Sequence, residues 1–155
     1  MGKFLKIGAL VLFLFACLII ALAPIGPMPG FFIGGTETKA PAKWGATAEV
    51  DEIRLMVPGS IPRVVIIWVV EYSGDLFVVG SSESGWVKML GEGGKVKMRV
   101  AGNTYNLNAD RVTSGWEPIV TAYANKYRPN YPEIVNNFPT VEEAEGSFGV
   151  FKLTR

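Results

Sequence analysis

The sequence contains no histidine and only one cysteine, Cys17, among its 155 residues. Without histidine the chain has no Ser-His-Asp or Cys-His catalytic group, no HExxH zinc site and no ordinary proton shuttle near neutral pH. A single cysteine forms neither an internal disulfide nor a metal cluster. We therefore expect no metal site in this protein.

The chain also lacks a strong excess of charge of either sign. Fifteen Lys and Arg residues face 14 Asp and Glu residues, so the net charge is +1, and the basic residues are not gathered into a tract. This balance gives no electrostatic reason to expect a nucleic-acid partner. Hydrophobic residues instead make up 49% of the chain, and the mean hydropathy of +0.28 is high for a soluble domain.

The apolar excess is concentrated at the N-terminus. Ile7 to Ala23 contains no charged residue and follows a short basic start that carries Lys3 and Lys6. With Phe4 and Leu5 added, the run approaches the roughly 20 residues that a helix needs to cross a bilayer. We predict a single transmembrane helix within residues 1–23, with a short cytoplasmic N-terminus.

Two other N-terminal signals compete with a retained anchor. A cleaved signal peptide would end at Ala21-Leu22-Ala23, but Pro24 is a poor first residue for a mature chain. A lipoprotein signal would end at Cys17, but the apolar run continues beyond it. Because the basic residues precede the run, the positive-inside rule places the remainder of the chain outside the cytoplasm, in the periplasm or beyond a bacterial inner membrane.

Residues 24–43 are rich in proline and glycine and predict an extended spacer. Within it, Phe31, Phe32 and Ile33 are too apolar for a freely solvated linker. They either rest on the lipid interface or on the chain's own domain, or they contact a partner membrane subunit.

The centre of the remaining domain, residues 44–155, is the stretch from Arg63 to Trp86. Val64 to Val70 is a continuous, β-branched apolar run that predicts a strand buried on both faces, with Leu76 to Val79 as its return partner. The loop from Gly80 to Trp86 that follows is rich in Gly and Ser, which leaves its backbone free to approach a ligand or another chain.

The flanking patterns complete an antiparallel barrel. They predict a strand within residues 50–57, a half-exposed hairpin over residues 96–109, an amphipathic helix over 119–127 behind a capping box at Ser114 and Glu117, a shorter helix over 131–138 and a last strand over 149–153. The expected fold is therefore mainly β with α: a small antiparallel β-barrel with two late helices packed outside it.

Several runs, taken in order, resemble the split-barrel superfamily of flavin and deazaflavin oxidoreductases. They are IRL at 53–55, PRVVIIWVV at 62–70, GDLFVVGS at 74–81, GW at 85–86, AYANKY at 122–127 and VFKL at 150–153. The family includes pyridoxamine-phosphate-oxidase-like proteins, and the nearest likeness is to an uncharacterised branch related to deazaflavin-dependent nitroreductases. The resemblance implies a split β-barrel.

In such relatives the cofactor lies across the barrel, with its phosphate held by two turns and its ring beside aromatic side chains. The resemblance implies these cofactor-binding positions here: Gly59, Ser60, Arg63, Trp68, Ser81, Ser82, Gly85, Trp86 and Lys88. The chain departs from the family because the first turn carries Met56, Pro58 and Ile61 where relatives carry additional Lys or Arg. Neutral side chains do not replace the charge-assisted bonds that those cations make to phosphate.

Two functional hypotheses follow. The first is an accessory or structural subunit, anchored in the lipid bilayer and docked on a larger membrane protein complex, with no cofactor and no catalytic residue. The second is a membrane-anchored oxidoreductase that keeps FMN or deazaflavin. We prefer the first, because the chain lacks histidine and the phosphate-binding cations, and because the domain is expected to face away from the cytoplasm where such cofactors are mainly found.

Overall fold

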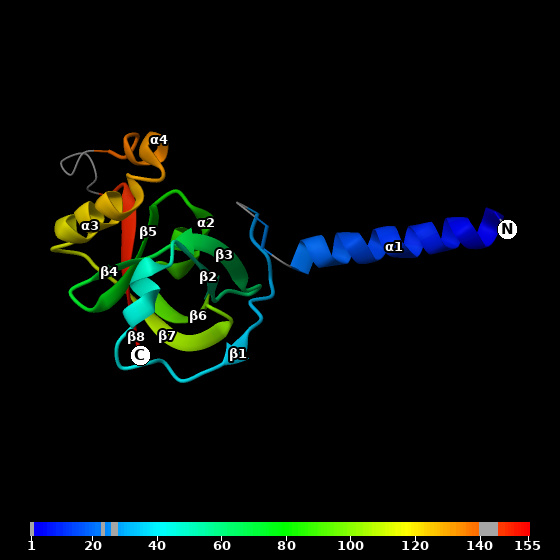
Figure 1. The fold of residues 1–155 in the computed structure, drawn as a ribbon, viewed down its shortest axis with the longest axis horizontal. Coiled ribbons are helices and arrows are strands. Elements are labelled where there is room, and N and C mark those ends of the chain that lie inside the picture. Colours follow the sequence, from blue (N-terminus) through cyan, green and yellow to red (C-terminus); the bar gives the residue numbers. More distant parts are fainter. Residues whose placement is uncertain (1, 23, 26–27, 140–145) are drawn as a thin grey trace.

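The computed structural model describes residues 2–22, 24–25, 28–139 and 146–155 (Figure 1). In chain order the elements are α1 (Gly2–Leu22), β1 (Thr36–Glu37), the 3-10 helix η1 (Gly45–Glu49), β2 (Glu52–Val57), β3 (Arg63–Trp68), β4 (Val70–Tyr72), β5 (Asp75–Ser81), α2 (Gly85–Leu90), β6 (Gly93–Val100), β7 (Asn103–Arg111), α3 (Glu117–Tyr127), α4 (Pro132–Val135) and β8 (Phe148–Thr154).

The strands form one curled, antiparallel sheet in the order β3-β2-β6-β7-β8-β5-β4. The short β1 adds to β7 in parallel. Only Val69 separates β3 from β4, although these strands stand at opposite ends of the order. The chain therefore links the two ends of the sheet directly, and the sheet curls into a half-barrel with α3 and α4 on its outside (Figure 1).

This break corrects the expected central hairpin. The run from Val64 to Val70 is two strands rather than one, and in β3 only Val64 is fully buried. β3 pairs with β2, while β5 pairs with the three residues of β4 and, over a longer stretch, with β8. The apolar pattern predicted extended structure correctly, but the predicted partner is right only for Val70, which pairs with Phe77, whereas Val64 to Trp68 pair with β2.

Two apolar clusters hold the half-barrel together. The first fills its interior and includes Leu55, Met98 and Phe151. The second lies between the outside of β4, β5 and β8 and the helices α3 and α4, and includes Phe77 and Tyr123. The predicted hairpin over residues 96–109 is confirmed as β6 and β7.

The late helices follow the prediction with two differences. The helix α3 begins at Glu117 and ends at Tyr127. Its N-cap residue is Trp116 rather than Ser114 and makes no side-chain capping bond, so the predicted capping box is not formed. The helix α4 covers only Pro132 to Val135, which is shorter than the predicted 131–138.

The helix α1 extends away from the half-barrel (Figure 1). Its described large apolar side chains are all exposed, from 54% for Leu18 to 85% for Phe4. Over the residues that the structure describes, no helix combines the length and the apolar character needed to cross a membrane.

Part of the expected spacer is attached to the barrel. Gly30 and Val64 exchange two backbone hydrogen bonds, of 2.9 and 2.8 Å. Farther along, the Arg99 guanidinium donates to the Ile33 carbonyl at 3.0 Å, and the Thr104 hydroxyl donates to the Gly34 carbonyl at 2.5 Å. The chain from Gly30 to β1 therefore crosses the outside of the sheet from β3 to β7.

Candidate functional site

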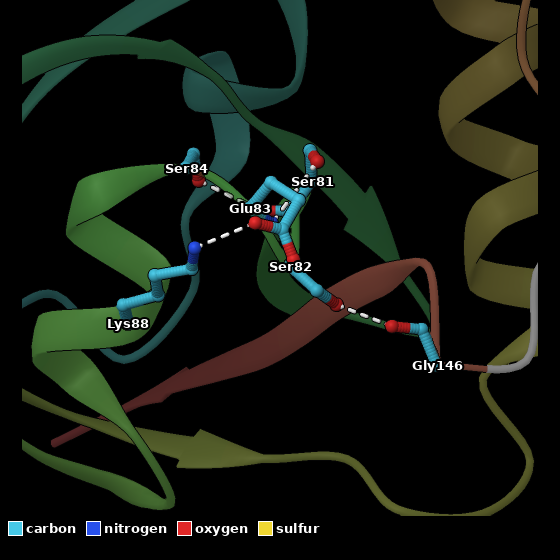
Figure 2. Close-up of polar contacts among 6 residues, drawn as sticks. All are labelled: Ser81, Ser82, Glu83, Ser84, Lys88 and Gly146. Atoms are coloured by element: carbon cyan, nitrogen blue, oxygen red, sulfur yellow. Dashed lines mark hydrogen bonds and ion pairs between the residues drawn. The ribbon is translucent and has the colours of Figure 1, made fainter.

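The loop between β5 and α2, defined here as the serine loop (residues 81–84), bonds mainly to its own chain (Figure 2). The Ser82 hydroxyl donates to the Gly146 carbonyl at 2.6 Å, and the Ser84 hydroxyl donates to the Ser81 carbonyl at 2.7 Å. The Glu83 backbone N–H donates to the Ser81 hydroxyl at 3.2 Å. The predicted phosphate loop is a closed turn in this structure.

The backbone donors of the serine loop are also engaged. The Ser82 N–H donates to the Ser147 carbonyl at 2.9 Å, and the Ser84 N–H donates to the Ser81 carbonyl at 2.9 Å. A phosphate site in a turn normally depends on consecutive N–H groups that point at the ligand. Here those N–H groups already have partners within the protein.

Lys88, the cation predicted to serve this loop, pairs with an acid instead. Its Nζ lies 2.6 Å from Oε2 of Glu83 (Figure 2). The hydrogen bond from Lys88, and then its charge, lower the pKa of the Glu83 carboxyl below its ordinary value. Because both side chains are exposed, water and salt weaken this pair.

Trp86, predicted to stack on a cofactor ring, belongs to the barrel interior. It is 7% exposed and packs with Phe151. Gly80 and Gly149 face each other across β5 and β8, and a Cβ atom on Gly80 would collide with the Trp86 ring. The two glycines thus leave the space that α2 fills with Trp86 and its neighbour Val87.

The residues of the first predicted turn do not stay together, and Arg63 alone is seen to approach the helix that follows the serine loop. A Cβ atom on Gly85 would collide with the Arg63 guanidinium, so this cation lies against the start of α2. Ser60 is exposed, and Gly59 lies against the Met89 methyl and lines a separate open cavity of about 610 Å³ between β2, β6 and β7. The predicted residues are therefore divided between two places on the surface.

Trp68 lies in an aromatic cluster at the end of β3. Its ring stacks on Tyr127 with centroids 4.2 Å apart and planes 12° apart, and it also contacts Tyr131 at 4.8 Å. Trp68 and Ser81 line one cavity of about 550 Å³, together with Tyr123, Phe138 and Phe148. Of the predicted cofactor residues, these two share a cavity, and Trp86 does not line it.

Lys126 and Tyr127, predicted only as part of the helix over 119–127 and of the run AYANKY, organise the break at Val69. The Tyr127 hydroxyl accepts from the Val69 N–H at 3.0 Å and lies 2.7 Å from the carbonyls of Val69 and Asp51. Lys126 Nζ donates to the Val50 and Val69 carbonyls at 2.6 and 2.8 Å. We call these two side chains and the backbone that they bind the Val69 hub.

Burial shapes the ionisation of the hub. It raises the pKa of the Tyr127 hydroxyl, although the bond from Val69 acts in the opposite direction, and the carboxylates of Asp51 and Glu52 raise it further. Burial likewise raises the pKa of Tyr123 and lowers that of Lys126. A Lys-Tyr pair at the end of an amphipathic helix was the available signal, but a terminal lysine is usually a solvated one.

These contacts test whether the implied flavin fits. Its phosphate would need free donors at the serine loop, but the hydroxyls of Ser82 and Ser84, two backbone N–H groups and Lys88 are bonded within the chain. Of the two tryptophans implied to lie beside its ring, Trp86 is enclosed in the core, whereas Trp68 lines the cavity of about 550 Å³. The serine loop, Lys88 and Trp86, as they are placed here, therefore do not fit the phosphate and ring of such a cofactor. Over the described residues, no cluster of three or more acidic or cysteine side chains is placed to hold a metal ion.

The three linker residues predicted to contact a partner subunit differ in their exposure. Ile33 is 7% exposed and is buried against the chain's own barrel, whereas Phe31 and Phe32 are 48% and 65% exposed.

No protein-family model matches this sequence, and no curated protein matches it either. Solved structures that are similar include the heme storage protein HutZ of Vibrio cholerae, at 15% identity over 67% of this chain and 80% of that one, with a TM-score of 0.49. A NimC/NimA family protein of Clostridium acetobutylicum matches at 20% identity over 67% and 73%, with a TM-score of 0.46.

A FAD and heme binding protein of Mycobacterium smegmatis matches at 13% identity over 68% of this chain and 60% of that one, with a TM-score of 0.48. At these identities and TM-scores, the likenesses assign neither a family nor a ligand to this chain. Its function is therefore argued from its own residues.

Proposed function

We propose that this chain is an accessory subunit without catalysis of its own, attached to a bacterial inner membrane through its N-terminal segment and docked on a larger membrane protein complex. The observation that carries the proposal is the exposure of α1. Ten large apolar side chains between Phe4 and Leu18 are more than half exposed. Since burial of each stabilises by about 1.5–3 kcal/mol, a helix of this kind gains on the order of 20 kcal/mol from apolar surroundings.

The charges around α1 suggest its orientation. Lys3 and Lys6 precede the apolar run, and the first charged residue after it is Glu37. Under the positive-inside rule, the proposal places the N-terminus in the cytoplasm and the half-barrel on the outer side of the membrane. A single-pass anchor is the form of attachment that the sequence predicts.

The serine loop supports an accessory role rather than catalysis. Its donors are bonded within the chain, so the surface is already satisfied without a small ligand. The cavity beside Trp68, which is lined mainly by apolar and aromatic side chains, is the surface that we assign to the partner complex.

Fractionation of cells that express the full chain tests the attachment. We expect the protein to remain with membranes after alkaline carbonate washing and to be released by detergent. A charge in the middle of α1, Phe13→Lys, costs roughly 3 kcal/mol in a bilayer and should shift protein to the soluble fraction, whereas Phe4→Lys, near the helix end, should not. Equal behaviour of the two variants would contradict membrane attachment through α1.

Native mass spectrometry of the detergent-solubilised particle tests the role in a complex. The proposal expects additional protein chains and no flavin mass. A flavin mass without any partner chain would overturn it.

The alternative is a membrane-anchored oxidoreductase that uses FMN or deazaflavin. It is favoured by one observation: Trp68 and Ser81 line the same cavity of about 550 Å³, which is large enough for part of a planar ligand. Under this alternative the purified protein is yellow or takes up added cofactor, and Arg63→Ala or Lys88→Ala weakens that uptake.

A further inference from the structure

The attachment of Gly30 to β3 decides which side of the half-barrel is held near α1. The helix ends at Leu22, and among the described residues the first backbone bonds to the barrel are those between Gly30 and Val64. Eight peptide units, at about 3.6 Å each, span at most about 29 Å. If the spacer were free as far as residue 43, its 21 units would span about 75 Å, and any face of the barrel could approach the membrane.

Further bonds keep the linker in place beyond Gly30. Thr36 N–H donates to the Gly102 carbonyl at 3.0 Å, and Thr38 N–H donates to the Thr104 carbonyl at 2.9 Å. These backbone bonds, with the side-chain bonds from Arg99 and Thr104, extend from β3 to β7. Figure 1 shows α1 leaving the half-barrel on the side along which this linker runs. The fold therefore fixes the place at which the linker leaves the half-barrel.

Exposed apolar side chains gather on this side. Phe31 and Phe32 directly follow Gly30, and they are 48% and 65% exposed. Ile61, three residues before Val64, is 65% exposed. Met89 of α2 is 36% exposed, and its methyl group lies against Gly59, which is in the same turn as Ile61.

Basic side chains flank these apolar residues. Arg63 stands between Ile61 and Val64, and Lys95 and Lys97 line the cavity shared with Gly59. Lys97 has only a loose pairing with Glu37, at 3.7 Å. Within the described part of the chain, no ion pair of 4 Å or less involves Arg63 or Lys95.

We propose that this side of the half-barrel lies on the lipid surface, with Phe31, Phe32, Ile61 and Met89 entering the headgroup layer and Arg63, Lys95 and Lys97 facing anionic headgroups. We call it the lipid-facing surface. The inference rests on the proposed membrane attachment, and it adds the face that is turned to the bilayer and the class of lipid that the face prefers. Apolar side chains surrounded by cations bind anionic lipid surfaces through burial and charge together.

The continuity with α1 selects lipid over a protein partner for this surface. The linker holds Gly30 within about 29 Å of the end of the apolar helix, so the exposed phenylalanines that follow it reach the headgroup layer without any rearrangement. The cations add electrostatic attraction to anionic headgroups, of about 1 kcal/mol for each Lys or Arg that lies at such a surface. The half-barrel then presents its opposite side, with α3 and α4, to the complex.

Site-specific fluorescence on the full chain in vesicles tests this inference. In a Cys17→Ser background, an environment-sensitive dye is attached at Phe32→Cys or Ile61→Cys, and at Ile134→Cys of α4 as a matched control, since Ile134 is also an exposed apolar residue, at 50%. The vesicles contain phosphatidylcholine with a minority of phosphatidylglycerol and a lipid that carries a nitroxide quencher on its headgroup. We expect the dyes at positions 32 and 61 to be quenched at least twofold more than the dye at 134, and to be shielded from aqueous iodide.

The outcomes separate this inference from the proposed function. If the protein does not float with the vesicles, both are overturned. If it floats and the dyes at positions 32 and 61 behave like the dye at 134, the lipid-facing surface is overturned while membrane attachment stands. We also expect quenching at position 61 to fall when phosphatidylglycerol is omitted, and Lys95→Gln with Lys97→Gln to remove that dependence. If quenching at position 61 is the same without phosphatidylglycerol and in the Lys95→Gln, Lys97→Gln variant, the preference for anionic lipid is overturned.

Discussion

The Val69 hub and the serine loop are built from the same kinds of group, but only one of them is buried. At the hub, a phenol and an ammonium bind backbone carbonyls where the sheet is interrupted between β3 and β4. At the serine loop, hydroxyls and an ammonium bind carbonyls and a carboxylate on the exposed surface. Both clusters are satisfied within the chain.

Two clusters with similar polar groups therefore differ in burial, and polar composition alone does not identify a ligand site. A buried donor or acceptor that loses its partner retains its desolvation penalty, whereas an exposed one exchanges its partner for water. The hub should therefore dominate the stability of the half-barrel, and the serine loop should contribute little.

The largest effect is expected from Tyr127→Phe. The change removes the hydroxyl and leaves the Val69 N–H without its partner in a buried place. We expect the free energy of unfolding to fall by about 2–3 kcal/mol, measured by urea denaturation of the detergent-solubilised chain. Tyr131→Phe is the matched control, because its ring also contacts Trp68, and it should change stability by less than about 0.5 kcal/mol. Equal losses in the two variants would contradict the hub.

Alkaline pH should weaken the same region by a somewhat smaller amount. Burial raises the pKa of Tyr123 and Tyr127 above the ordinary value of 10.0, so above that pH the unfolded chain loses protons that the folded protein keeps. The unfolded state then binds fewer protons, and stability falls as pH rises, by about 1 kcal/mol per tyrosine between pH 10 and about 11.

The lowered pKa of Lys126 acts in the opposite direction and earlier. Between its folded pKa and the ordinary value of 10.5, the unfolded chain binds more protons, so its contribution to stability rises with pH and offsets part of the tyrosine effect until pH exceeds 10.5. Urea midpoints measured across this range should therefore fall above pH 10, and Tyr127→Phe should remove about half of the fall. A midpoint that stays level would argue against burial of both phenols.

The sequence predicted the elements of the fold better than their connections. Alternation along residues 96–109 predicted the hairpin of β6 and β7, because one face of each strand is buried and the other is solvated. The run from Val64 to Val70 carries no mark of the break at Val69, since the residues that satisfy its backbone lie 57 and 58 positions away, in α3. Contacts so distant in sequence are invisible to periodicity.

The linker shows a second limit of sequence-based prediction. Proline and glycine correctly excluded long regular structure in residues 24–43, but the bonds between Gly30 and Val64 join backbone groups, which every non-proline residue carries. Composition therefore could not distinguish a free spacer from one that is attached to the sheet. The burial of Trp86 was unpredictable for a similar reason, because the space that it fills exists only where Gly80 and Gly149 pair across two strands.

A more modest loss is expected from Lys126→Met. The change removes the donor to the Val50 and Val69 carbonyls but keeps most of the apolar stem that packs beside Tyr127. We expect the free energy of unfolding to fall by about 1 kcal/mol. This is less than the contribution of a fully buried hydrogen bond to a charged group, because the ammonium is only partly buried and water can reach the carbonyls. Lys95→Met on the surface should stay within about 0.5 kcal/mol of the parent protein in the same urea experiment. If the two lysine variants lost the same free energy of unfolding, the Lys126 ammonium would not stabilise the hub.

The smallest effect is expected from Ser82→Ala in the serine loop. Its hydroxyl bond to the Gly146 carbonyl is exposed, so water replaces it, and the free energy of unfolding should change by no more than about 0.5 kcal/mol (Figure 2). The informative measurement is a thermal-shift titration of the parent protein and Ser82→Ala with FMN or inorganic phosphate. We expect neither compound to stabilise either protein, because the donors of the loop are bonded within the chain. If a ligand stabilises the parent protein and Ser82→Ala abolishes this effect, the loop opens to accept a phosphate. The Val69 hub would then be a structural cluster and the serine loop a functional one.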